Sequence, residues 1–154
     1  MIVYRIAKSK KRAADLSGMG AYKEGGRWNN AGTYMLYTSE NSSLAYLENL
    51  VHFEVENTPP NLYIMSIELK ADDALIYTLL DKIYPKSWQE IGNLQNKIIG
   101  DQLMDQRKFL AVKTRSAINK LEYNYLLNPL FPGYHDLVTV RLIEELAVDA
   151  RLVK

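Results

Sequence analysis

The most regular pattern of apolar and polar positions lies in residues 62–69. Tyr63, Met65, Ile67 and Leu69 alternate with the residues between them, which is the two-residue period of a β-strand with one buried face. Shorter runs rich in β-branched and aromatic residues predict further strands. These strands cover residues 1–6, 33–38, 109–114 and 137–143.

Other segments follow a helical period. Ser39 can cap a helix that runs to about Phe53, and Leu44, Leu47 and Val51 share one of its faces. Trp88, Ile91, Leu94 and Ile98 predict a helix over 87–104. A brief helix is predicted over 13–17, stopped by Gly18, and the stretch LEYNYLLNP (121–129) is interpreted as a helix that ends at a buried polar turn.

The remaining segments are predicted to be irregular. Residues 18–32 hold five of the eight glycines and are read as a loop, 57–61 as a turn around Pro59 and Pro60, and 71–86 as an irregular connection. Short strands interrupted by helices, without regular βαβ alternation, favour an α+β fold. The length of 154 residues, without a repeat or linker, predicts one domain over 1–154.

Composition narrows the possible functions. The net charge of +1 gives no general attraction to nucleic acid or membrane, and the basic run Lys8–Arg12 is interpreted as a solvated loop or helix start. There is no cysteine and there are only two histidines, so a metal site is not expected. No apolar stretch approaches the ~20 residues of a membrane span. We therefore expect a cytoplasmic protein.

Glu48 lies at the margin of an apolar helix face. It stands four residues after Leu44 and one after Leu47, about 40° from the edge of the apolar stripe on a helix that turns ~100° per residue. One interpretation is a boundary glutamate whose stem packs while its carboxylate reaches water. The other is a partly desolvated carboxylate beside a cleft, where it would stabilise a developing cation.

Arg27 follows two adjacent glycines, which permit unusual backbone angles and the close approach of a ligand. Its guanidinium suits phosphate oxygens, although a surface arginine in a glycine turn is an equal alternative. No GxxxxGK[ST] or GxGxxG motif occurs, so neither a P-loop nor a Rossmann site is supported. Tyr37 is either packed at a strand end or stacked on a heteroaromatic ring, and Ser116 is either a ligand donor or a helix cap.

The order of these features resembles the RES-domain family, named for an arginine, a glutamate and a serine. The similar stretches are YRI (4–6), SGMGAYKEGGRWNNAG (17–32), YTSENSSLAYLENLVH (37–52), PKSW (85–88), RSAINKLEYNYLLNP (115–129) and VDARL (148–152). The resemblance covers essentially the whole chain, and the run GGRWN followed by G, YTS and a helical LE is specific to it. It departs from the family pattern at Arg115, where a proline is usual, and at Phe131, where a histidine is common.

The resemblance implies an ADP-ribosyltransferase-like fold, with a split mixed β-sheet and flanking helices, that acts on NAD. The resemblance implies that Arg27 binds the phosphates of NAD and that Tyr37 stacks near the nicotinamide. It also implies that Glu48 contacts the ribose and stabilises its developing cation, and that Ser116 forms a hydrogen bond with the ligand. The implied function is a toxin that cleaves and depletes NAD at the nicotinamide–ribose bond by hydrolysis or phosphorolysis. The alternative is an ADP-ribosyltransferase that modifies a cellular protein.

The resemblance also implies a partner, an antitoxin with an Xre-like helix-turn-helix domain that covers the active site. No metal cofactor, direct nucleic-acid binding or membrane attachment is expected. A non-enzymatic binding module that uses the Lys8–Arg12 cluster is a further alternative, but the near-neutral net charge counts against it.

Overall fold

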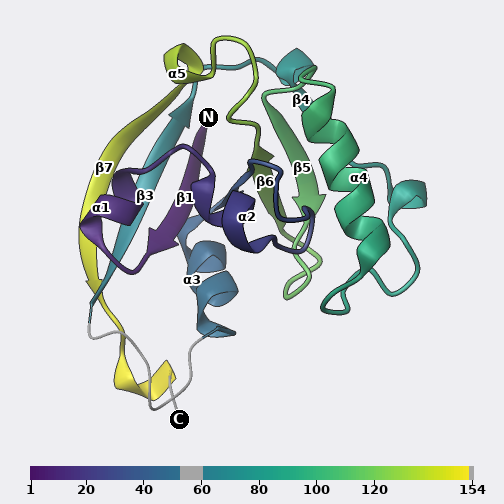
Figure 1. The fold of residues 1–154 in the computed structure, drawn as a ribbon. Coiled ribbons are helices and arrows are strands. Elements are labelled where there is room, and N and C mark those ends of the chain that lie inside the picture. Colours follow the sequence, from purple (N-terminus) through teal and green to yellow (C-terminus); the bar gives the residue numbers. More distant parts are fainter. Residues whose placement is uncertain (53–60, 153–154) are drawn as a thin grey trace.

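The computed structural model describes residues 1–52 and 61–152, and its centre is a seven-stranded mixed sheet (Figure 1). The strand order is β4-β5-β6-β2-β1-β3-β7, and only β4 and β5 run parallel. The strands are β1 (Ile2–Ala7), β2 (Leu36–Ser39), β3 (Asn61–Leu69), β4 (Ile76–Thr78), β5 (Ala111–Arg115), β6 (Tyr123–Leu127) and β7 (Val138–Ala147).

The sheet is divided into two parts that join at a narrow point. β1 and β2 share only one aligned pair, Tyr4 with Ser39, whereas β1 pairs with β3 over its whole length. The four strands β4-β5-β6-β2 therefore form one part and β1-β3-β7 the other. This arrangement confirms the predicted α+β fold with a split mixed sheet.

The helices flank this sheet. They are α1 (Lys10–Ala14), α2 (Met19–Glu24), α3 (Ser42–Leu50), α4 (Leu94–Asp105) and α5 (Tyr134–Leu137), and the described residues also form 3-10 turns at Asp73–Leu75, Asp81–Ile83 and Ala150–Leu152. Figure 1 shows α4 lying alongside β5. Met104 of α4 packs with Val112 of β5 and Leu126 of β6.

The core lies on both faces of the sheet because neighbouring residues of a strand point to opposite sides. One face carries Leu36, Ala111 and Leu127 in the main cluster. The other carries Met35, Val112 and Leu126, which pack against Trp28 and α4. Tyr37 belongs to this second face, as the alternation of Met35 and Tyr37 with Leu36 predicts.

Two strand predictions were incomplete. The segment 121–129 is not a helix: residues 123–127 form β6, in which Tyr123 and Tyr125 alternate with Asn124 and Leu126. The polar turn after it does exist, because buried Asn128 donates to the Met104 carbonyl. Within the connection 71–86, residues 76–78 form β4, whose backbone pairs with β5.

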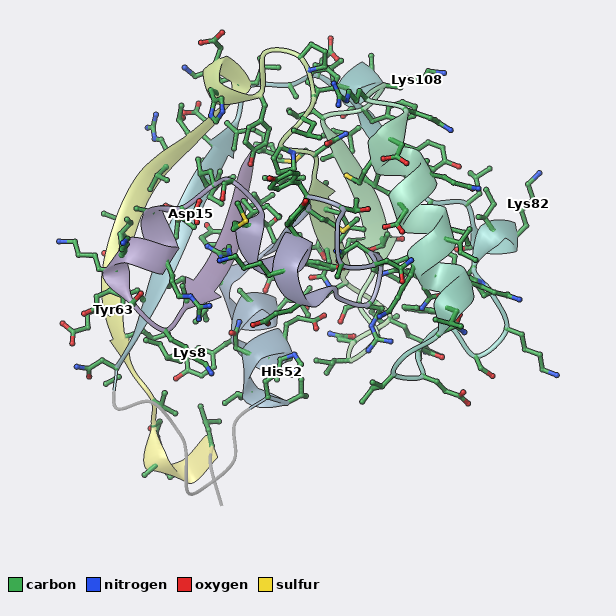
Figure 2. All side chains as sticks on the ribbon, in the orientation of Figure 1. Lys8, Asp15, His52, Tyr63, Lys82 and Lys108 are labelled. Carbon is green, nitrogen blue, oxygen red and sulfur yellow. The ribbon has the colours of Figure 1, made fainter. Side chains whose placement is uncertain are left out.

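The helix boundaries also differ from the predicted ones at the N-terminal side. The first helix spans Lys10–Ala14 instead of 13–17, because the Ser9 hydroxyl accepts from the Arg12 amide and starts it earlier. The basic run is thus a helix start, with Lys8 exposed (Figure 2). The glycine-rich stretch 18–32 contains the short helix α2. The cap of α3 is Asn41, not Ser39, and the predicted end near Phe53 and most of the turn 57–61 lie outside the described residues.

The largest error concerns α4. It starts at Leu94 with Asn93 as its cap, and the residues expected to be buried are exposed: Ile91 by 97%, Leu94 by 68% and Ile98 by 52%. The buried side consists of Asn96, Gly100 and Met104. A glycine and an asparagine do not register as an apolar stripe, so periodicity selected the wrong face.

Candidate functional site

The second face of the sheet carries a row of polar side chains across three strands. Ser39 on β2 is paired with Asn124 on β6, and Asn124 is paired with Thr114 on β5. Paired residues point to the same side of a sheet. All three lie on the face covered by α3 and α4, and two of them belong to a hydrogen-bonded network that ends at Glu48.

Glu48 reaches this row from α3. The helix begins where the Asn41 side chain accepts from the Leu44 amide, and it buries Leu44 and Ala45 against the sheet. Glu48, one turn after Leu44, is half-buried, and its Oε1 accepts from Ser116 Oγ and from Asn124 Nδ2, each at 2.7 Å. Its Oε2 makes no hydrogen bond to the described residues. The carboxylate is thus held at the sheet through Oε1, and its role toward a developing cation stays a prediction.

Ser116 comes directly after β5 and is fully buried. Its hydroxyl donates to Glu48 and accepts from the amides of Ile118 and Asn119, each at 3.1 Å. One donor and two acceptor lone pairs are all that a serine hydroxyl has. The Ser116 hydroxyl therefore uses all of its hydrogen-bonding capacity within the protein.

Arg27 lies in a tight turn closed by the Gly26–Asn29 bridge, and Gly25 just before this turn adopts a φ of 75°. Its Nη1 donates to the carbonyl oxygens of Trp88, Gln89 and Glu90 at 3.2, 2.9 and 3.3 Å. The Nε and Nη2 groups donate to none of the described residues. Arg27 thus fastens the segment before α4 and retains N–H groups that can bind an anion.

Tyr37 lies under the same turn. Its hydroxyl accepts from the Trp28 amide at 2.9 Å and donates to Asn29 Oδ1 at 2.8 Å. A side chain at Gly26 would meet the Tyr37 hydroxyl at 2.6 Å, so this close approach requires glycine. Burial raises the pKa of the Tyr37 phenol well above its usual range, and the Trp28 amide and the nearby Arg27 guanidinium oppose part of that shift.

The two buried tyrosines Tyr37 and Tyr134 predict a loss of stability in alkali. Burial raises the pKa of both phenols, so the unfolded chain loses these protons first, near its ordinary pKa of about 10. The free energy of unfolding is then expected to fall as pH rises above about 10. Chemical denaturation between pH 8 and 11 tests this, and the Tyr134→Phe variant should lose less stability over that range than the wild type. Equal losses would contradict the prediction.

The predicted site residues share one face of the sheet. Tyr37 and Ser39 are two residues apart on β2, a separation of about 7 Å along a strand. Arg27 adjoins Tyr37, while Glu48 and Ser116 reach Ser39 through Asn124. Asn124 and Ser39 were not predicted to belong to the site. The alternating tyrosines could have identified 123–127 as a strand, but not its pairing with β2, which brings Asn124 beside Ser39.

Arg115 occupies a position where a proline is usual in the family pattern. Its amide donates to the Tyr84 hydroxyl at 2.8 Å, a bond that proline cannot make. Its guanidinium donates to Asp81 and to the Lys120 carbonyl, and to none of the residues of the Glu48 network. Phe131 packs against the main core cluster. Both departures are accommodated outside the Glu48 network.

The comparison with family models decides the identity. The model of the RES domain matches residues 2–149. The chain belongs to the RES-domain family. Two curated relatives named "Toxin Res" are similar over nearly their whole length. The protein from Photorhabdus laumondii is 30% identical over 100% of this chain and 98% of its own, and the one from Pseudomonas putida is 32% identical over 99% of both.

A third relative bears a more specific name. The "Prs ADP-ribosylating toxin" of a Sphingobium species is 30% identical over 98% of this chain and 96% of its own. Among solved structures, the crystal structure of the M. tuberculosis MbcT-MbcA toxin-antitoxin complex contains a similar chain, with a TM-score of 0.69 and 17% identity over 95% of this chain and 84% of that one. At this identity, the similarity shows a shared fold.

Two further properties concern the described residues. In 1–52 and 61–152, no helix is both long and apolar enough to cross a membrane. The same residues contain no group of three or more histidine, aspartate or glutamate side chains that is placed to hold a metal ion.

Proposed function

We propose that this RES domain is a toxin that breaks the nicotinamide–ribose bond of NAD. The observation that carries the proposal is the carboxylate of Glu48: one oxygen is held by two short hydrogen bonds, while the other makes none. This group shares a sheet face with a guanidinium that keeps unpaired N–H groups among the described residues. An anionic ligand with a ribose fits such a pair of charges.

The chemistry needs little more than these groups. Cleavage builds positive charge on the ribose, as in the oxocarbenium-like transition states of glycoside hydrolysis. Nicotinamide leaves as a neutral molecule from a cationic ring, so strong acid catalysis is unnecessary. Glu48 Oε2 contacts the ribose hydroxyls and stabilises the cation. Arg27 binds the pyrophosphate with Nε and Nη2, and the Tyr37 ring packs beside the nicotinamide.

The name of one relative supports a protein, instead of water or phosphate, as the acceptor of the ADP-ribose group. The Sphingobium relative is named an ADP-ribosylating toxin, and it is as similar in sequence as the relatives named only as toxins. Transfer of ADP-ribose to a protein begins with the same bond cleavage, and only the nucleophile differs. The same four residues would serve either reaction, with Ser116 acting through Glu48.

The relatives also support a partner. "Toxin Res" proteins and a similar chain in a toxin-antitoxin complex motivate the proposal that an antitoxin neutralises this chain. We propose that it carries an Xre-like helix-turn-helix domain and covers the surface around Glu48. Leu47 on α3 and Val51 at its C-terminal cap are both exposed, and they provide apolar surface near Glu48 for such a contact.

Mass analysis of NAD breakdown tests the activity and identifies the acceptor together. Purified protein is incubated with NAD in the presence and absence of inorganic phosphate. Nicotinamide with ADP-ribose indicates water as the acceptor, and a phosphorylated ADP-ribose that appears only with phosphate indicates phosphorolysis. Labelled NAD added to a cell extract tests transfer to a protein. If nicotinamide is released in none of these reactions, the proposed function is wrong.

A further inference from the structure

We infer that Asn124 is a positioning residue for Glu48 and that Ser116 shares this task instead of contacting the substrate. The inference rests on the proposed function for its effect on rate, but on the hydrogen-bond network for the contact itself. Asn124 Nδ2 and Ser116 Oγ converge on the same carboxylate oxygen, each at 2.7 Å. They come from β6 and from the turn after β5, so α3 is tied to two strands at one atom.

The orientation of the Asn124 amide is fixed from its other end. The Ser39 hydroxyl, itself buried, donates to Asn124 Oδ1 at 2.8 Å. The oxygen of the amide therefore faces Ser39, and its NH₂ group faces Glu48. A chain of side chains, Ser39–Asn124–Glu48–Ser116, thus runs across the sheet and holds the carboxylate in one rotamer.

This arrangement separates the two oxygens of Glu48 by role. Oε1 is saturated by charge-assisted hydrogen bonds, which are short and strong. Oε2 is left as the oxygen that meets the ribose. Loss of the Asn124 amide would free the carboxylate to rotate and weaken its alignment with the developing cation. Loss of comparable orienting partners elsewhere costs roughly 10–100-fold in activity.

The decisive variant is Asn124→Asp, which replaces the donor by a second carboxyl group of nearly the same shape. Two carboxyl groups at this distance disfavour the doubly charged state, so the pair keeps one proton to a higher pH than a lone carboxyl group would. With that proton, the new carboxyl still donates to Glu48; without it, the two groups repel. Nicotinamide release by Asn124→Asp, relative to the wild type, is expected to fall by about tenfold or more between pH 5 and 8.

Two matched variants accompany it. Gln102→Glu makes the same amide-to-carboxylate change on the exposed side of α4, and its activity relative to the wild type should stay constant with pH. Asn124→Ala removes the amide without adding charge, so its rate should fall about 10–100-fold, through kcat more than KM and to a similar extent at each pH. If Asn124→Asp does not fold at neutral pH, the rate of Asn124→Ala still tests the positioning role of Asn124.

Thermal unfolding supplies a readout that does not depend on NAD. The folded Asn124→Asp protein holds a proton that the unfolded chain has already lost above about pH 4. Its Tm relative to the wild type should therefore fall progressively as pH rises from about 4 to 8. Gln102→Glu should show no such trend.

If Asn124→Asp parallels Gln102→Glu in both Tm and activity, Asn124 does not hold Glu48 and the inference is overturned. If Tm falls with pH as expected but the wild type releases no nicotinamide, the contact stands and the proposed function is the part that fails. A full rate in Asn124→Ala would equally overturn the positioning role.

Discussion

Replacing Glu48 by glutamine is expected to lower the rate of nicotinamide release by about 10²–10³-fold while the protein remains folded, because it removes a preorganised charge from the site of bond cleavage. The amide oxygen of glutamine can accept both hydrogen bonds that Oε1 accepts from Ser116 and Asn124. The NH₂ group then replaces Oε2 and presents a partial positive charge to the cation. The substitution changes the electrostatics and keeps the shape.

The measurement is the rate of nicotinamide release with saturating NAD, together with Tm for each protein. Glu144→Gln on β7 is a suitable control, since this glutamate is exposed and its side chain forms no hydrogen bond to the described residues. It should retain the wild-type rate. A Glu48→Gln variant with wild-type activity would remove Glu48 from the proposed mechanism, and a large drop in its Tm would show that the change is not confined to charge.

The position of Glu48 beside the sheet can be read from the sequence because it depends on local spacing. Leu44 marks the buried side of α3, and Glu48 lies one helical turn after it. Leu47 and Val51, expected on the same apolar face, are instead 40% and 61% exposed, so that part of the prediction was wrong. Arg27 was also identifiable, since two glycines before an arginine imply a tight turn. Neither local pattern shows which residues form hydrogen bonds with Glu48 or Arg27. Arg27 binds the carbonyls of Trp88, Gln89 and Glu90, more than sixty residues further along the chain.

Asn124 shows why the rest of the site was missed. The segment 121–129 has apolar residues that fit either a helix or a strand, and short apolar runs of this kind are ambiguous from periodicity alone. The outcome depends on pairing with β2 and β5, which are distant in sequence. Only as a strand does the segment bring Asn124 next to Ser39 and within reach of Glu48.

The face of α4 was misjudged for a related reason. The helix packs through its smallest side chain, because Gly100 lies against the backbone of Trp28. On either side of this contact, Asn96 donates to the Trp88 carbonyl and Asp101 accepts from the Asn30 amide. Gly100 and Asp101 thus contact the loop that carries Arg27, whereas Asn96 binds the segment before α4 that Arg27 also contacts. Hydrophobic periodicity does not detect a contact in which two backbones approach closely because one residue is glycine.

This contact leads to the second large prediction, for Gly100→Ala. An added Cβ would overlap the carbonyl oxygen of Trp28 and lie 2.7 Å from its carbonyl carbon. Both atoms belong to backbone, so the conflict is relieved only if α4 or the 25–30 turn moves. We expect a loss of about 3 kcal/mol or more of unfolding free energy. For a chain of this length, that corresponds to a fall in Tm of roughly 6–12 °C.

The same movement should impair the site. Trp28 donates its amide to the Tyr37 hydroxyl, and its neighbour Arg27 is held by the segment that precedes α4. Displacing Trp28 therefore shifts the guanidinium relative to Glu48, and a misplacement of about 1 Å can cost on the order of 10²-fold in rate. Nicotinamide release by Gly100→Ala should fall by about that factor at temperatures where the variant remains folded.

Gly20→Ala is the matched control. Gly20 lies in the short helix α2, and a Cβ there would meet nothing within 4 Å. Alanine in a helix is more stable than glycine by roughly 0.5–1 kcal/mol, so Tm should stay constant or rise slightly, with full activity. A Gly100→Ala protein that matches Gly20→Ala in Tm would show that α4 does not press on the Arg27 turn. A Gly100→Ala protein with lowered Tm but full activity would show that the packing of Trp28 and the placement of Arg27 are independent.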